Sequence, residues 1–148
     1  MSHIKYKNKN LYVESISVKG LTSKHISPFY LYSSKNIIEN YNNFYNNFKK
    51  VEPLICFSVK ANSNIEILRT LKKMGSGADV VSGGELLKAL KSGIRPNKIV
   101  FSGVGKTDEE LRLAIKKNIL LINVESENEA ILINKISGQM RKKTSIGI

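Results

Sequence analysis

The chain has 148 residues, of which 41% are hydrophobic and 24% charged, and its formal net charge is +12. This length and apolar content allow one domain, or part of a larger one, with a buried core, and the single cysteine excludes an intramolecular disulfide framework and a cysteine-cluster metal site. Lysines dispersed along the whole chain carry most of the positive charge, so we expect only weak, salt-sensitive contact with nucleic acids and no dedicated nucleic-acid partner.

Residues 1–27 are interpreted as an N-terminal arm. The segment MSHIKYKNKN at its start lacks the apolar core of a signal peptide. No stretch of the sequence reaches the roughly 20 apolar residues that a membrane-spanning helix needs. We therefore expect a cytoplasmic protein with no membrane partner.

From Pro28 onwards, short apolar runs alternate with segments of helical periodicity. The predicted strands are 28–33, 53–59, 77–82, 98–103, 119–124 and 144–148. The first predicted helix is 34–50, and the later ones place apolar residues at helical spacing, as Leu86, Leu87 and Leu90 do. Regular alternation of strand and helix predicts the α/β class, with a parallel sheet covered by helices.

Capping boxes of the form Ser/Thr-x-x-Glu mark the expected starts of the later helices. In such a box the two side chains satisfy free backbone N–H groups around the first helical turn. The boxes are Ser63/Glu66, Ser82/Glu85, Thr107/Glu110 and Ser126/Glu129. The residues that this register places near the carboxyl ends of successive strands are Lys60, Asp79, Ser102 and Val124. In parallel α/β folds, ligands bind at that edge of the sheet.

Two architectures fit this pattern, an open doubly wound sheet and part of a (β/α)8 barrel. A barrel usually takes about 250 residues, and this chain supplies only about half of its strand-helix units. The last predicted strand would end in its first few residues and leave a sheet edge unpaired. If the fold is a barrel, we expect this chain to form only part of it.

Two glycine-containing segments resemble phosphate-binding motifs without matching them. GSGADV (75–80) has Val80 at the third glycine position of the dinucleotide fingerprint and precedes a strand instead of following one. FSGVGKT (101–107) ends like a P-loop, but Val100 stands where the first glycine belongs. We interpret both as turns between strands and helices.

The segment CFSVK, residues 56–60, draws attention to Lys60. Alternation along a strand puts Cys56, Ser58 and Lys60 on one face and the large apolar side chains on the other. A lysine inside a barrel would lose solvation energy unless it were paired or neutral, which makes Lys60 a candidate Schiff-base amine. Spacing alone leaves open a second interpretation, in which the side chain extends from the strand end into solvent.

Four segments together resemble the diaminopimelate decarboxylase family of pyridoxal-phosphate enzymes. They are ICFSVKANSN (55–64), GSGADVVSGGEL (75–86), IVFSGVGKT (99–107) and ILLINVESENE (119–129). The resemblance covers residues 28–148. It implies a partial (β/α)8 TIM barrel of the alanine racemase-like type, truncated within the pyridoxal-phosphate-binding barrel so that about half of it is present.

The resemblance also assigns roles to individual residues. Lys60 matches the lysine that holds pyridoxal 5'-phosphate as an aldimine, and Ala61 matches a small residue that packs by the cofactor ring. Asp79 and Glu85 match acidic residues near that lysine and the cofactor. Glu85 has a competing structural explanation as the capping partner of Ser82, whereas an unpaired Asp79 inside an apolar strand would be costly and therefore favours a site role.

The implied function is decarboxylation of meso-diaminopimelate to L-lysine. Family residues that stack on the cofactor and hold its phosphate would lie beyond Ile148, so we expect this chain alone to be incomplete and inactive. A second polypeptide could supply the rest of the barrel and the β-domain, and the family is typically homodimeric. The alternatives are a non-catalytic pyridoxal-phosphate-binding protein of the single-barrel type and a decaying gene remnant.

Overall fold

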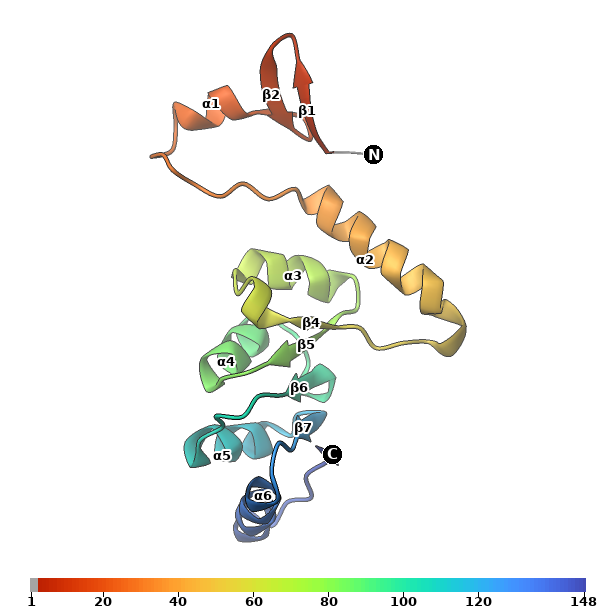
Figure 1. Cartoon of the computed structure of the whole chain (residues 1–148), viewed down its shortest axis with the longest axis vertical. Coiled ribbons are helices and arrows are strands. Elements are labelled where there is room, and N and C mark those ends of the chain that lie inside the picture. Colours follow the sequence, from red (N-terminus) through yellow and green to blue (C-terminus); the bar gives the residue numbers. More distant parts are fainter. Residues whose placement is uncertain (1–2) are drawn as a thin grey trace. The chain divides into compact units, whose positions relative to one another are not determined.

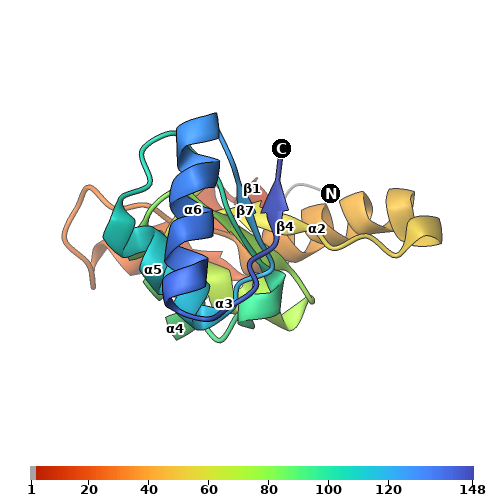
Figure 2. The ribbon, with the colours of Figure 1, turned by 90° about the horizontal axis from the view of Figure 1, so that it is seen from below.

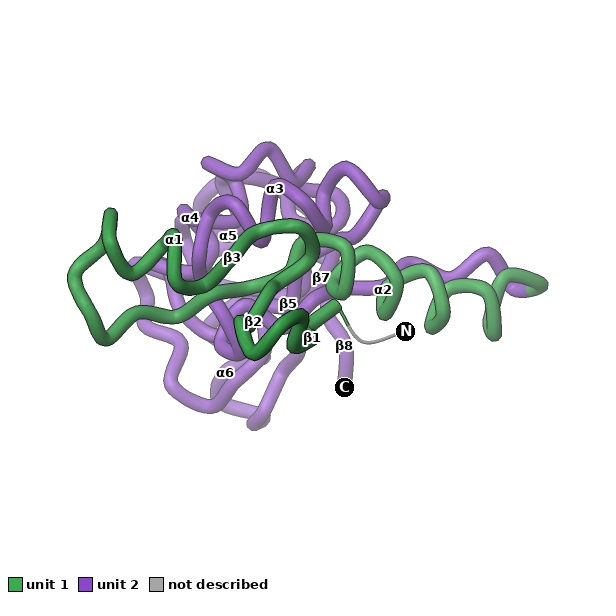
Figure 3. The backbone as a smooth tube through the Cα atoms, turned by 90° about the horizontal axis from the view of Figure 1, so that it is seen from above, with its two compact units in different colours: residues 1–50 green, residues 51–148 purple. Residues whose placement is uncertain are grey.

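The computed structural model describes residues 3–148, and the chain divides into two compact units, Met1–Lys50 and Val51–Ile148 (Figure 3). The boundary expected between an arm and a barrel, at residues 27 and 28, does not coincide with this division and remains a prediction.

The first unit begins with a small antiparallel sheet. Its strands are β1 (Ile4–Lys7), β2 (Asn10–Val13) and β3 (Ile16–Ser17), paired in the order β1-β2-β3, and helix α1 (Val18–Thr22) follows. Asn8 and Lys9, between β1 and β2, both have positive φ, at 49° and 62°. This backbone suits a two-residue hairpin turn whose twist matches that of its strands. The N-terminal arm is therefore a folded sheet and helix.

The strand predicted for residues 28–33 is absent. These residues lie outside helices and strands in the described chain, because an apolar run becomes a strand only when a neighbour completes its hydrogen bonds. The next element is confirmed: helix α2 (Ser34–Phe48) starts where Ser33 Oγ accepts the Asn36 N–H at 3.1 Å, and the 3-10 turn η1 (Lys49–Val51) ends it. Glu14 accepts hydrogen bonds from the Ser33 hydroxyl and the Lys35 N–H, which tie the helix start to the small sheet.

The second unit is a regular succession of strands and helices. Its elements are β4 (Cys56–Ser58), η2 (Val59–Ala61), α3 (Ile65–Lys73), β5 (Gly77–Val80), α4 (Gly83–Lys91), η3 (Pro96–Lys98), β6 (Ile99–Phe101), α5 (Asp108–Lys117), β7 (Leu121–Asn123), α6 (Glu127–Gln139) and β8 (Ile146–Gly147). All the predicted strands from 53 onwards are present, each shorter than its apolar run. Within residues 3–148, no helix combines the length and apolar character needed to cross a bilayer.

The strand order decides between the two architectures. Strands β4 to β8 pair in parallel in sequence order, β4-β5-β6-β7-β8, and the strands and helices of this unit succeed one another down Figure 1. A doubly wound sheet reverses its strand order at a switch point, which this sheet does not do. Successive right-handed crossovers put all the helices on one face, with each helix beside the next, as α5 and α6 are in Figure 2. This is the arrangement of a (β/α) barrel segment.

The core lies between the sheet and these helices. Alternate strand residues point into it and are fully buried: Val59, Ala78, Val80, Ile99, Phe101 and Ile122. The helices contribute a matching row: Leu68, Leu86, Leu111 and Ile136. Because side chains alternate along a strand, burying this set fixes which residues of each strand face the opposite side of the sheet.

The helix starts confirm three of the four predicted caps. Thr107 and Glu110 form a complete capping box, and the hydroxyls of Ser82 and Ser126 accept the N–H groups of Glu85 and Glu129. The last two caps are not complete capping boxes, because the glutamate carboxylate accepts the N–H of the residue before the cap. Val81 donates to Glu85 at 2.9 Å, and Glu125 donates to Glu129 at 2.7 Å.

The cap predicted at Ser63 is wrong. Helix α3 begins one residue later than expected, with Asn64 as its cap: the Asn64 side chain accepts the Glu66 N–H at 2.9 Å. Asn62 accepts the Asn64 N–H at 3.0 Å and so shapes the turn before the helix. The Ser63 hydroxyl instead accepts a hydrogen bond from Lys88 on α4 at 2.8 Å.

Glu110 also links two neighbouring helix starts. One carboxylate oxygen accepts the Gly83 N–H at the start of α4 at 2.6 Å, and the other accepts the Thr107 N–H at 3.0 Å. These two backbone hydrogen bonds, the one from Gly83 being the stronger influence, lower the pKa of Glu110 from its usual value. A Cβ atom on Gly83 would come within 3.0 Å of the Glu110 side chain, so a glycine permits this close approach.

Adjacent leucines on α4 test the position of the core. Leu86 is fully buried and Leu87 is 53% exposed. We expect Leu86→Ala to lower the free energy of unfolding by about 2–5 kcal/mol, because it removes apolar contacts and leaves a cavity. Leu87→Ala, the matched control, should change it by about 0.5 kcal/mol or less. Urea unfolding followed by circular dichroism measures the free energy of unfolding of both variants. An equal decrease in the two variants would contradict the burial of Leu86 in the core.

The link made by Glu110 should depend on pH. Because the pKa of Glu110 is lower in the folded chain than its usual 4.5, its contribution is complete above about pH 4.5 and is lost as the pH falls through the folded value. We expect Glu110→Gln to be destabilised by about 1 kcal/mol at pH 7, and this difference from the unmodified chain should shrink towards pH 3.

The control is Glu109→Gln, which removes a carboxylate from the same exposed helical turn. The difference in free energy of unfolding between Glu109→Gln and the unmodified chain should change less between pH 7 and pH 3. Urea unfolding at several pH values measures both differences. A Glu110→Gln difference that stayed constant over this range would contradict the proposed hydrogen-bond effect.

Candidate functional site

A row of hydrogen-bonded polar side chains crosses the sheet on the face opposite the core. Ser58, on β4, donates to Asp79 Oδ2 at 3.2 Å, and Ser102, after β6, donates to Asp79 Oδ1 at 2.6 Å. Asn123, on β7, then donates to Ser102 Oγ at 3.1 Å. We call these four residues, one from each of four neighbouring strand ends, the polar row.

The strand register explains why these side chains meet. Ser58 lies directly opposite Asp79 in the parallel pairing of β4 and β5. Their neighbours Val59 and Val80 are fully buried on the core side, so both polar side chains point the other way. The sequence suggested that Asp79 would need a partner inside its apolar strand. In the structure its carboxylate is half-buried and receives two hydroxyl donors.

Lys60 lies just beyond the end of β4, within the 3-10 turn η2. Val59 anchors this turn in the core, whereas Lys60 and Ala61 are exposed. Of the two interpretations that the spacing leaves open, the exposure of Lys60 agrees with the one in which the side chain extends into solvent, because the chain turns out of the strand one residue before Lys60. Within residues 3–148 the Lys60 amine forms no ion pair, so it is open to a reacting molecule.

Glu85 does not join the polar row. Its carboxylate accepts the Val81 N–H at 2.9 Å, and its own N–H is bonded to the Ser82 hydroxyl. These contacts shape the turn that follows Asp79 and begins α4. In this structure Glu85 thus has a backbone role next to the polar row.

Lys106, the lysine of the near P-loop segment, is completely buried. Its amine donates to the carbonyl oxygens of Gly103 at 2.8 Å and Asn123 at 2.7 Å, and it pairs with a Glu129 carboxylate oxygen at 2.9 Å. A P-loop lysine must reach a bound phosphate. Lys106 instead joins the turn after β6 to the end of β7 and the start of α6, which agrees with the interpretation of this segment as a turn.

Two glycine N–H groups at this edge of the sheet are also engaged by carboxylates. Gly83 donates to Glu110, and Gly103 donates to Glu125 at 3.1 Å. Backbone N–H groups in such turns are the usual donors to a phosphate group. These two therefore do not form a free phosphate cradle in this structure.

Cys56, on the same face as the polar row, is unsuited to be a nucleophile. Burial raises the pKa of its thiol, and the charge of Asp79 adds to this effect. Because the thiolate is the reactive form, the raised pKa keeps Cys56 in its unreactive state at neutral pH. The exposed amine of Lys60 is the better candidate for attack on a carbonyl compound.

Sequence reasoning missed part of this arrangement. The sequence places Ser58 on the same face as Lys60 but gives it no hydrogen-bond partner, and nothing in the sequence singles out Asn123. The available signal was positional. Each member of the polar row lies within one residue of the end of its strand, on the face that the apolar alternation leaves free.

Comparison with known proteins gives a consistent result. Residues 34–146 match the family described as pyridoxal-dependent decarboxylase, pyridoxal binding domain. The diaminopimelate decarboxylase of Aquifex aeolicus is 42% identical over 146 residues, which are 99% of this chain and 34% of that protein. A diaminopimelate decarboxylase of Helicobacter pylori is 49% identical over 122 residues, 82% of this chain and 30% of that protein.

Solved structures agree with the fold. A crystal structure from Aquifex aeolicus superposes with a TM-score of 0.95 at 42% identity, over 99% of this chain and 36% of that one. The Helicobacter pylori diaminopimelate decarboxylase, complexed with L-lysine, gives a TM-score of 0.84 at 46% identity, over 86% of this chain and 32% of that one. The predicted partial (β/α)8 barrel is thereby confirmed.

The chain spans about a third of the length of the curated relatives it matches. Within that third, the family match covers the whole succession of strands and helices that carries Lys60 and the polar row. The chain belongs to the family of pyridoxal-dependent decarboxylases, and residues 34–146 match within its pyridoxal-binding domain.

Proposed function

We propose that this chain contributes the cofactor-attachment part of a decarboxylase that converts meso-diaminopimelate to L-lysine. The observation that carries the proposal is the exposed amine of Lys60 at the end of β4, the strand whose Ser58 begins the polar row. The similarity to diaminopimelate decarboxylases at 42% and 49% identity supports the choice of substrate.

The residues present fit the aldehyde end of pyridoxal 5'-phosphate. Lys60 offers an accessible primary amine, and the adjacent Ala61 is small enough to leave room for a flat ring. Asp79 is held in one orientation by two hydroxyl donors, which fixes where its charge lies relative to the strand ends. When bound, the cofactor supplies the electron sink for the carbanion that remains after carbon dioxide leaves.

In this proposal each residue has a separate task. Lys60 Nζ is the nucleophile that attaches the cofactor, Ala61 packs beside the ring, and Asp79 places a carboxylate near the attachment point. Glu85 acts indirectly, by shaping the turn after Asp79 through its hydrogen bond with Val81. The glycine N–H groups engaged by Glu110 and Glu125 favour a phosphate site formed elsewhere in the protein.

The proposal extends to partners that the relatives suggest. Because the matched relatives are about three times as long as the shared region, we propose that decarboxylation uses further sequence that completes the barrel and the β-domain. That sequence belongs either to the same polypeptide or to a second one. A homodimer and a cytoplasmic location remain part of this proposal. Lysine formation from meso-diaminopimelate by the completed protein is the corresponding assay.

Covalent attachment of the cofactor at Lys60 tests the proposal directly. After incubation with pyridoxal 5'-phosphate and reduction with borohydride, peptide mapping should find the cofactor mainly on the peptide that contains Lys60. Lys60→Ala should lose this attachment, whereas Lys91→Ala, which removes another exposed lysine, should retain it. Labelling spread equally over the exposed lysines would contradict the assignment.

Asp79→Asn tests the contribution of the oriented carboxylate. An amide has one oxygen and cannot accept from both Ser58 and Ser102 as the carboxylate does, so we expect about a tenfold or greater loss of cofactor affinity. Asp108→Asn, at the exposed start of α5, is the control and should bind normally. Absorbance of the cofactor measures binding, and circular dichroism checks the fold. An unchanged affinity of Asp79→Asn for the cofactor would show that the Asp79 carboxylate does not contribute to cofactor binding.

A further inference from the structure

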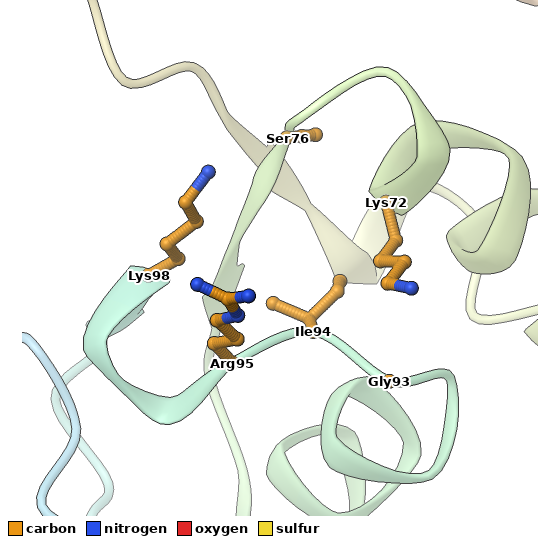
Figure 4. A pocket seen from close by; sticks show the side chains of 6 residues that line it. All are labelled: Lys72, Ser76, Gly93, Ile94, Arg95 and Lys98. Carbon is orange, nitrogen blue, oxygen red and sulfur yellow. The ribbon is translucent and has the colours of Figure 1, made fainter.

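A second feature of this unit lies at the amino ends of the strands, away from Lys60 and the polar row. A hollow of about 260 Å³ opens between the end of α3, the residues just before β5 and the segment that leads from α4 into β6. Its lining residues are Lys72, Ser76, Gly93, Ile94, Arg95 and Lys98 (Figure 4).

The floor of this hollow is neutral and its walls are cationic. Ser76 and Ile94 are 2% and 3% exposed, and the Ser76 hydroxyl is already bonded to the carbonyl oxygens of Ile55 and Gly77. Figure 4 shows Ile94 between Lys72 and Arg95, with Lys98 beyond Arg95. Half of the lining residues are therefore cations and none is a carboxylate.

These three cations are not neutralised by the described chain. Within residues 3–148, none of them forms an ion pair with a carboxylate. The Lys98 amine donates to the Gly75 carbonyl oxygen at 2.9 Å, which orients it, and the described residues give the Arg95 guanidinium no hydrogen-bond acceptor. Gathered cations without partners repel one another, and an anion between them would relieve that repulsion.

A glycine forms the turn that borders this hollow. Gly93 has a φ of +91°, a conformation that residues with a side chain rarely adopt. A Cβ atom there would lie 3.6 Å from the Lys72 side chain, in ordinary contact with it. The positive φ, and not a lack of space beside Lys72, therefore explains the glycine in the turn after α4.

We propose that this hollow binds a small anion with two or more negative charges, of the phosphate class. The Arg95 guanidinium would provide the directional contact, because its planar donors match the oxygens of a phosphate, and the two lysines would add charge on either side. The site is distinct from cofactor attachment at Lys60, because it lies at the opposite ends of the strands. It therefore does not depend on the proposed function.

Titration of the chain with inorganic phosphate and with pyrophosphate, in chloride buffer of constant ionic strength, tests the site. Isothermal titration calorimetry should show saturable binding at one site for each chain, tighter for pyrophosphate because it carries more charge. Arg95→Ala should weaken pyrophosphate binding about tenfold or more, and Lys72→Ala should weaken it by a smaller factor.

The matched control is Lys73→Ala. Lys73 is the exposed neighbour of Lys72 on α3, and its replacement removes the same charge without touching the hollow. It should leave binding unchanged. Arg95→Lys, which keeps the charge and loses the forked donors, should restore only part of the affinity.

Two results would overturn the proposal. One is the absence of saturable binding of either anion. The other is equal weakening by Lys73→Ala and Arg95→Ala, which would assign the binding to the overall charge of +12. Arg95 and Lys72 are both exposed, and circular dichroism of each variant establishes that a lost affinity is not a lost fold.

Discussion

The burial of one face of the parallel sheet is the constraint on which the rest of this structure depends. Val59, Val80 and Phe101 are fully buried under the helices. Because side chains alternate along a strand, the residues next to them must point to the opposite face of the sheet. The polar row of Ser58, Asp79, Ser102 and Asn123 is the other half of the same alternation. A shift of one residue in any strand would bury a polar side chain and expose an apolar one, so the core specifies the site as firmly as the site's own hydrogen bonds do.

A second layer of interactions joins the turns at the carboxyl ends of the strands. Glutamates at the helix starts reach backbone N–H groups outside their own capping boxes: Glu110 reaches the start of α4, and Glu129 reaches the end of the preceding turn. The buried Lys106 adds to these interactions through its ion pair with Glu129. Acidic residues at helix starts thus do two things at once. They stabilise their own helices, and they hold adjacent turns at fixed separations.

The sequence was sufficient for the features that repeat. Alternation of apolar runs and helical periods predicted the strands from 53 onwards and the parallel sheet, and the resemblance of four segments selected the barrel family. It was insufficient where a residue's partner is distant in the chain. Residues 28–33 have strand character but no strand pairing in the described chain. The Ser63 hydroxyl bonds to Lys88, 25 residues away, while Asn64 caps α3. The hollow bounded by Lys72, Arg95 and Lys98 could not be predicted, since only the fold brings the end of α3 beside the segment that leads from α4 into β6.

At Lys106 the shape of the charged group matters as much as its charge. Its ammonium group has three N–H bonds, and three oxygens surround it, from Gly103, Asn123 and Glu129. Three donors thus meet three acceptors, and a planar guanidinium with five donors in the same place would leave buried N–H groups unpaired. An exchange of lysine for arginine, harmless at most of this chain's many surface lysines, would here force apart the turns that border the polar row.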